Sequence, residues 1–85
     1  MITIAQLSAA CLTLARKLSP PTCCGAFPVI EVTEIGNDVI LTARRWSEAY
    51  PSPAAAMAAL PMWGARFNRS DGEVRKALEG EVHDA

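Results

Sequence analysis

Arginine and tryptophan side chains in two short segments are the residues of this sequence best suited to recognition chemistry. Residues 44–46 read Arg-Arg-Trp, and residues 63–69 read Trp-Gly-Ala-Arg-Phe-Asn-Arg. Arginine and tryptophan are enriched at the energetic hot spots of protein interfaces. From residue 44 to residue 69 there are four arginines and a single acid, Glu48. The sequence therefore predicts a partner-binding surface that contains Arg44, Arg45, Trp46, Trp63, Arg66 and Arg69.

Two other interpretations of these segments remain open. Arginine beside aromatic rings also contacts phosphates and stacks on bases, which would make the same surface a nucleic-acid site. The chain has 8 basic and 9 acidic residues and a net charge of −1, which disfavours general nucleic-acid binding, because such proteins are usually clearly basic. Trp46, Trp63 and Phe67 are also the largest side chains of a small protein, and they can form its core instead of its surface.

The sequence contains no pattern that predicts catalysis. Nucleophilic catalysis requires a serine or cysteine with a histidine and an orienting acid, but the single histidine, His83, is the third residue from the end of the sequence printed here. The carboxylates of Glu31, Glu34 and Asp38 fall on or near a predicted turn and are expected to be solvated. We therefore expect no enzymatic activity and no cofactor.

The cysteines indicate a reducing compartment. The count of 3 is odd, and Cys23 and Cys24 are adjacent, which does not fit the disulfide framework of a secreted domain. No Cys-x-x-Cys pair accompanies the lone histidine, so no zinc site is expected. The apolar run 4–15 is too short to cross a bilayer, and its basic residues follow it rather than precede it, unlike in a signal peptide. The sequence predicts a cytoplasmic protein without membrane attachment.

The first element that must position the candidate surface is an N-terminal helix over residues 3–18. Thr3 and Gln6 have the spacing of a capping box, in which each side chain satisfies a backbone N–H at the helix start. Apolar residues recur at helical spacing, which places them on one face. That face can pack on the rest of the chain or form a homodimer seam. Its residues are Ile4, Leu7, Cys11, Leu14 and Leu18.

A β-hairpin over residues 27–46 is the predicted centre of the fold. Two β-branched runs flank Gly-Asn-Asp at 36–38, which is a tight-turn signal. If residues 36–37 form the turn, Val32 faces Leu41; if residues 37–38 form it, Thr33 faces Thr42. Both sets are chemically sensible cross-strand pairs. Because a lone hairpin is marginal in water, we expect a third strand toward Tyr50, a covering helix or a partner chain.

Two further helices complete the predicted domain. Ser52 and Pro53 have the residue types of an N-cap and a first helical position, and the alanine-rich segment that follows favours a helix. Pro61 is expected to end or kink it. Ser70 and Glu73 are placed to cap a short last helix over 73–78, and residues 80–85 are expected to fray. The fold class is therefore α+β, a single domain over residues 1–85 with two or three antiparallel strands.

Two resemblances add to this interpretation. A hairpin followed by an alanine-rich helix is similar to the double-stranded RNA-binding domains, although Tyr-Pro-Ser-Pro at 50–53 replaces their lysine cluster. In size, α+β layout and mixed charge, the chain also resembles the small phage-encoded inhibitors of the anti-CRISPR type. The second resemblance implies a cytoplasmic inhibitor that binds and occludes a host protein or nucleoprotein complex.

Taken together, the residues predict a non-catalytic protein–protein interaction module that uses the arginine and tryptophan surface, and the second resemblance implies that it is an inhibitor. A nucleic-acid-binding regulator is the alternative. A homodimer is a further possibility, because hydrophobic residues make up 51% of a chain of only 85 residues, and some of that surface can be covered by a second copy. The apolar helix face or a free sheet edge would form the dimer contact.

Overall fold

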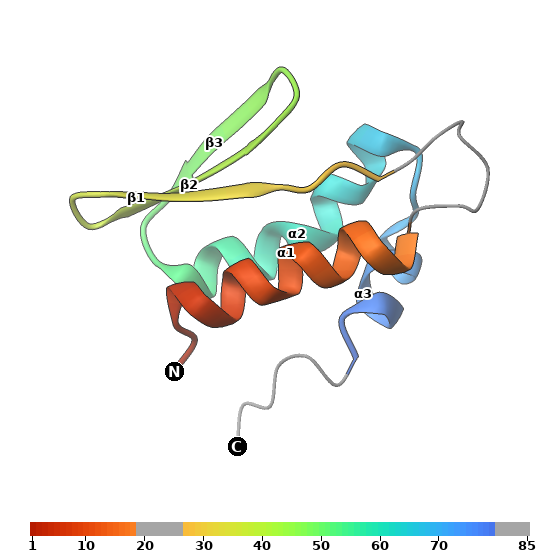
Figure 1. The fold of residues 1–85 in the computed structure, drawn as a ribbon, viewed down its shortest axis with the longest axis horizontal. Coiled ribbons are helices and arrows are strands. Elements are labelled where there is room, and N and C mark those ends of the chain that lie inside the picture. The colour runs from red at the N-terminus through yellow and green to blue at the C-terminus, as the bar shows by residue number, and fades with distance from the viewer. Residues whose placement is uncertain (19–26, 80–85) are drawn as a thin grey trace.

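The computed structural model describes residues 1–18 and 27–79 and has the predicted α+β architecture (Figure 1). Its elements are α1 (Ile4–Leu18), β1 (Glu31–Ile35), β2 (Asp38–Ala43), β3 (Trp46–Tyr50), α2 (Pro53–Gly64), the 3₁₀ turn η1 (Ala65–Phe67) and α3 (Asp71–Ala77). The predictions for Cys23, Cys24, His83 and the frayed end lie outside the described residues.

The predicted capping box is present at the start of α1. The backbone N–H of Thr3 donates to Gln6 Oε1 at 2.8 Å, and the N–H of Gln6 donates to Thr3 Oγ1 at 3.1 Å. Leu7, Cys11 and Leu14 are at most 1% exposed, so the apolar face of α1 packs inside the chain. The centre of this face is therefore not free to form a homodimer contact. A free sheet edge is the remaining candidate for such a contact.

The three strands form one antiparallel sheet in the order β1-β2-β3. Val32 pairs with Leu41, so Gly36 and Asn37 form the first turn, and the alternative turn at 37–38 is wrong. Gly36 has φ +61°, a conformation that glycine adopts without steric cost, which explains this choice. The third strand follows a second turn at Arg44 and Arg45, because Ala43 pairs with Trp46.

The helices cover one face of the sheet (Figure 1). Along β2, Val39, Leu41 and Ala43 are buried, whereas Ile40 and Thr42 are partly exposed. This alternation follows from the pleat, which points successive side chains to opposite faces. The residues of β3 that share the covered face are therefore the partners of the buried β2 residues, namely Trp46, Glu48 and Tyr50.

Helix α2 begins as predicted but does not end at Pro61. Ser52 Oγ accepts a hydrogen bond from the N–H of Ala55 at 3.1 Å, and Pro53 opens the helix. The helix continues through Pro61 to Gly64, although proline removes one hydrogen bond of the ladder. Pro61 is buried together with Leu60, and this packing offsets the lost bond. Asn68, with φ +62°, ends η1.

The second predicted capping box is confirmed at the start of α3. Ser70 Oγ accepts from the N–H of Glu73, and Glu73 Oε1 accepts from the N–H of Ser70, both at 3.1 Å. The helix starts at Asp71, two residues before the predicted start, because Ser70 is the N-cap. Val74 and Ala77 are buried as expected.

Gly64 allows α2 and α3 to approach closely, which gives a first testable prediction. A Cβ atom at Gly64 would lie 2.5 Å from Val74 Cγ2 and 3.1 Å from the carbonyl oxygen of Arg69. We expect Gly64→Ala to lower the free energy of unfolding by about 1–3 kcal/mol through overpacking, as measured by urea denaturation. Gly72→Ala is the matched control, since its Cβ would meet only Ser70 Oγ at 3.9 Å.

A double-mutant cycle tests the cause of this effect. If the clash with Val74 is responsible, Gly64→Ala combined with Val74→Ala should lose about 1–2 kcal/mol less than the sum of the two single changes. Additive losses would show instead that the conflict is with the carbonyl of Arg69.

Candidate partner-binding site

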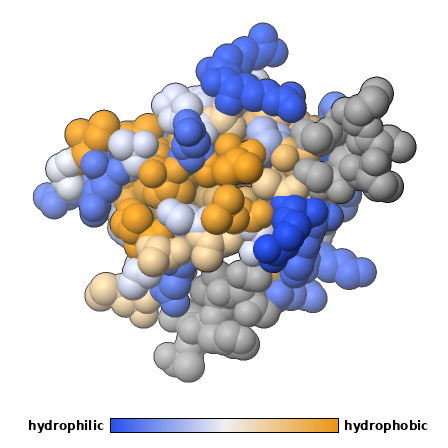
Figure 2. All heavy atoms as spheres, in the orientation of Figure 1, coloured by the Kyte–Doolittle hydropathy of each residue, from blue (hydrophilic) through white to orange (hydrophobic). Residues whose placement is uncertain are grey.

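The turn between β2 and β3 carries two adjacent arginines. Arg44 and Arg45 are both exposed, and the turn that carries them lies at one end of the sheet (Figure 1). In Figure 2, hydrophilic side chains project at the same place. Arg44 has φ +55°, whereas Arg45 does not have a positive φ. We refer to Arg44, Arg45 and Trp46 as the hairpin tip.

Aromatic rings support the arginines of the tip. The guanidinium carbon of Arg44 lies 5.7 Å from the ring centre of Phe67 in η1, and that of Arg45 lies 5.8 Å from the ring centre of Trp46. Both distances are within the range of cation–π attraction. The Arg44–Phe67 contact places the turn against η1 at the end of the helical layer. It joins two residues that are 23 positions apart in the sequence.

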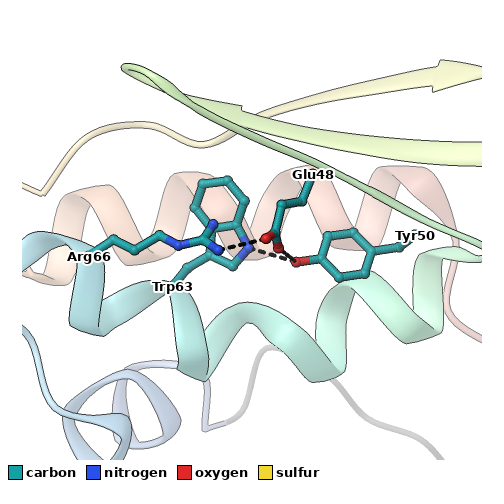
Figure 3. Close-up of polar contacts among 4 residues, drawn as sticks. All are labelled: Glu48, Tyr50, Trp63 and Arg66. Atoms are coloured by element: carbon teal, nitrogen blue, oxygen red, sulfur yellow. Dashed lines mark hydrogen bonds and ion pairs between the residues drawn. The ribbon is translucent and has the colours of Figure 1, made fainter.

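Arg66 forms the centre of the site beneath the tip. Its guanidinium carbon lies 4.7 Å from the ring centre of Trp46 and 4.4 Å from that of Trp63, so it contacts one indole from β3 and one from α2. Its Nη2 donates to Glu48 Oε1 at 2.8 Å (Figure 3). Nη1 is buried and has no hydrogen-bond partner, and the two indoles supply its electrostatic environment. We refer to Trp46, Glu48, Trp63 and Arg66 as the indole clamp.

Tyr50 joins the two sides of the indole clamp. Its hydroxyl donates to Glu48 Oε2 at 2.7 Å and accepts from Trp63 Nε1 at 2.9 Å (Figure 3). Hydrogen bonds therefore run from Trp63 through Tyr50 to Glu48, where Arg66 also binds. Because the contacts link β3 with α2, they fix the position of the hairpin relative to the helices.

The structure separates the six predicted residues by exposure. Trp63 is 1% exposed, so it belongs to the core. Trp46 is 37% exposed, so it belongs to the surface. In this conformation a partner would not touch the ring of Trp63. Arg69 lies apart from the clamp: its Nη2 donates to the carbonyl of Leu18 at 2.8 Å and connects the end of α1 to the α2–α3 connection.

Glu48 and Tyr50 belong to the candidate site, and the sequence prediction missed them. They follow Trp46 at intervals of two, and alternate residues of a strand share a face. This signal was present in the sequence, but it depends on knowing that a strand begins at Trp46 after the turn.

The pKa values of the clamp follow from its hydrogen bonds. Donation by Tyr50, followed by donation from Arg66, lowers the pKa of Glu48 below its ordinary value of 4.5. Burial, with a contribution from the bond to Glu48, raises the pKa of Tyr50 above its ordinary value of 10.0. Elsewhere, burial raises the pKa of the Cys11 thiol to about 12, so this thiol stays protonated and unreactive at neutral pH.

The lowered pKa of Glu48 predicts a dependence of stability on pH. A carboxyl group with a depressed pKa in the folded chain stabilises it above the unfolded value and loses this effect as the pH falls through the folded value. We therefore expect the free energy of unfolding to fall as the pH is lowered below about 4.5, and Glu48→Gln to reduce that slope. Urea denaturation at a series of pH values from 7 to 3 measures how the free energy of unfolding depends on pH.

Glu34→Gln is the control for this pH effect. Glu34 is exposed on β1, and no ion pair within the described part of the chain includes it. Its replacement should leave the slope nearly unchanged. An equal change of slope in both variants would mean that the clamp does not favour the ionised form of Glu48.

Comparison with known proteins does not identify a relative. No protein-family model, curated protein or solved structure matches the chain. Within residues 1–18 and 27–79, no three His, Cys, Asp or Glu side chains are grouped to hold a metal ion. No helix in this part of the chain is long and apolar enough to span a membrane. A function must therefore be inferred from the geometry of the hairpin tip and the clamp.

Proposed function

We propose that the protein is a non-catalytic interaction module whose hairpin tip binds an acidic surface of a protein partner. By occupying that surface, it acts as a small inhibitor of a host protein or nucleoprotein complex, as its resemblance to anti-CRISPR proteins implies. The observation that carries the proposal is the conformation of Arg44, an exposed arginine with φ +55° at the first position of a two-residue turn.

This conformation is unfavourable for arginine. A side chain with a Cβ atom at positive φ costs roughly 1–2 kcal/mol, which glycine avoids. The first turn of the same sheet has glycine at the equivalent position, where Gly36 has φ +61°. Local strain of this kind concentrates at functional sites. The presence of an arginine in this conformation at the second turn therefore supports a role for its charge in binding.

The indole clamp makes the tip suitable for binding. Because Arg66 stacks on Trp46 and pairs with Glu48, the exposed indole is already ordered before a partner arrives. A preorganised side chain saves roughly 0.5–1.5 kcal/mol of ordering entropy on association. The tip thus presents two adjacent cations and one rigid aromatic edge, which together favour an acidic protein surface with an apolar depression.

A nucleic-acid-binding regulator is the second candidate. The observation that favours it is the same pair of exposed arginines beside an exposed indole, since these groups also contact phosphates and bases. Binding to mixed DNA and RNA, weakening steeply as salt is raised, would support it. No binding at low salt would exclude it.

Charge reversal at the tip tests the protein-binding proposal. The tagged protein is used to capture partners from host lysate, and captured proteins are identified by mass spectrometry after nuclease treatment. We expect Arg44→Glu with Arg45→Glu to abolish capture of a specific protein, with an unchanged circular dichroism spectrum. Arg75→Glu with Lys76→Glu makes the same change of charge at an exposed pair on α3 and should retain capture. Equal capture by both double variants would refute the tip as the binding surface.

Arg44→Gly separates the role of the charge from the role of the fold. Glycine relieves the positive φ but removes the cation–π contact with Phe67, so we expect this variant to be between equally stable and about 1 kcal/mol more stable than the parent chain in urea while capturing less partner. Arg45→Gly is the matched control, because Arg45 does not have a positive φ and its replacement should give no gain in stability. Full capture by Arg44→Gly would show that the partner does not need this cation.

A further inference from the structure

The outer side of β3 is an open edge of the sheet beside the hairpin tip. β3 is the last strand in the order β1-β2-β3, so no other strand of the described residues pairs with its outer side. Residues 46–49 of this strand are all exposed. An edge strand presents backbone N–H and C=O groups that can pair with a strand of another chain.

The register of the sheet identifies the backbone groups at this edge. Opposite residues of an antiparallel pair alternate between those that exchange both backbone hydrogen bonds and those that exchange none. Ala43 and Trp46 close a two-residue turn and are a pair of the first kind, so every second residue after Trp46 also bonds to β2. The N–H and C=O groups of Ser47 and Ala49 therefore point away from the sheet.

Side chains leave this edge accessible. The indole clamp holds Glu48 on the covered face, directed toward α2 together with Tyr50 (Figure 3). On the other face, Ser47 and Ala49 have small side chains. Proteins often protect an open edge with lysine, proline or a bulge. β3 contains no lysine or proline, and it pairs residue by residue with β2 without a bulge.

The charges beside the edge favour an acidic segment. Arg44 and Arg45 are exposed just before the first residue of β3. The carboxylate within the strand, Glu48, already accepts hydrogen bonds from Arg66 and Tyr50. In an antiparallel partner strand, the residues opposite the two arginines lie at its C-terminal end, so carboxylates at that end would meet both cations.

A second copy of this chain does not supply such carboxylates. Two β3 strands can pair antiparallel by joining Ser47 or Ala49 of one copy to either residue of the other. In each of these registers, the two arginines of the tip would lie opposite residues 49–54 of the second copy, and none of these is acidic. The charge pattern therefore favours a different, acidic chain.

We propose that an extended acidic segment of the protein partner adds to β3 as a fourth, antiparallel strand, with carboxylates at its C-terminal end bound to Arg44 and Arg45. This inference rests on the function proposed for the hairpin tip and specifies the form of the acidic surface. Backbone hydrogen bonds to Ser47 and Ala49 supply affinity, and the arginines fix the direction of the segment. One residue opposite each of residues 44–50 gives a segment of about seven residues.

Three capped heptapeptides test the proposal by nuclear magnetic resonance titration of the isotope-labelled protein. The first is Thr-Val-Thr-Val-Thr-Glu-Glu, the second has both glutamates at its N-terminal end, and the third has lysines in their place. We expect the first to bind at least about tenfold more tightly than either other peptide and to slow hydrogen exchange at the amides of Ser47 and Ala49. In Arg44→Glu with Arg45→Glu, the third peptide should bind more tightly than the first.

N-methylation of the first peptide separates strand addition from attraction between charges. Its two valines lie opposite Ser47 and Ala49, so methylation of both valine nitrogens should weaken binding at least about tenfold. Methylation of the second and third threonine nitrogens, which point away from β3, should leave the affinity within about threefold. Equal or reversed effects of the two methylations, or equal affinity for the first and second peptides, would overturn the proposal.

A variant of β3 separates this inference from the function proposed for the tip. Ala49→Pro removes an outward N–H, and proline is tolerated on an edge strand where that group faces solvent. It should lose capture of the partner from lysate with an unchanged circular dichroism spectrum, whereas Ala49→Val keeps the N–H and should retain capture. If Ala49→Pro captures normally while Arg44→Glu with Arg45→Glu does not, the tip binds its partner without strand addition. Capture that survives both changes would refute the function proposed for the tip.

Discussion

Trp63→Ala should lower the free energy of unfolding by about 3–5 kcal/mol, the range for removing a buried tryptophan. Trp63 is 1% exposed, and its ring stacks on Phe67 with 6.4 Å between ring centres. The change would also remove the donor to Tyr50 and one face of the cation–π contact with Arg66. Since small domains are stable by only roughly 5–15 kcal/mol, this single change would remove a large part of the total.

Urea denaturation followed by circular dichroism measures the effect, and Trp46→Ala is the control. Trp46 is 37% exposed on an edge strand, so its removal should cost about 1–2 kcal/mol, mainly through its contact with Arg66. A larger loss for Trp46→Ala than for Trp63→Ala would contradict the assignment of Trp63 to the core and Trp46 to the surface.

A second variant, Trp63→Phe, isolates the indole N–H. Phenylalanine keeps most of the buried apolar area but leaves the hydroxyl of Tyr50 without its donor. We expect a smaller loss than for alanine, with the lost hydrogen bond contributing about 0.5–1.5 kcal/mol of it, because the hydroxyl of Tyr50 still donates to Glu48. Equal losses for phenylalanine and alanine would indicate that the hydrogen bond matters more than the packing.

The two tryptophans show which features of this fold the sequence could predict. The capping boxes of α1 and α3 were predictable because each depends on residues three positions apart. The exposure of Trp46 and Trp63 was not, because it depends on how β3 packs on α2. That contact joins residues well separated in the chain, and no local signal specifies it.

The second turn of the sheet was unpredictable for a related reason. Turn signals in a sequence come mainly from glycine, proline, asparagine and aspartate, and Gly36 with Asn37 marked the first turn in this way. Arg44 and Arg45 are not such residues, yet the chain turns there. Contacts with Phe67 and the pairing of β2 with β3 hold the arginine at positive φ, so tertiary structure overrides the local preference.

The second large effect is expected at Arg66. Arg66→Ala should lower the free energy of unfolding by about 2–3 kcal/mol, because each of its two cation–π contacts contributes roughly 0.5–2 kcal/mol, depending on desolvation. Its side chain is 22% exposed, so water screens these contacts only in part. Arg75→Ala is the control: its ion pair with Asp71 is exposed, and such pairs contribute about 0.5 kcal/mol or less.

Arg66→Lys distinguishes stacking from charge. Lysine keeps the positive charge near Glu48, but its ammonium group lacks the flat surface with which a guanidinium stacks on aromatic rings. We therefore expect Arg66→Lys to retain less than half of the stabilisation lost in Arg66→Ala. A lysine variant as stable as the parent chain would show that charge alone holds the clamp.

The same variants connect the stability of the clamp with binding at the tip. Arg66 contacts Trp46 directly, so its loss should free the exposed indole and reduce partner capture even though Arg44 and Arg45 remain. Capture should then fall in the order parent chain, Arg66→Lys, Arg66→Ala, measured at a temperature where all three are folded. If capture were unchanged while stability fell, binding would depend on the arginines of the turn and not on a rigid Trp46, and the clamp would serve only the fold.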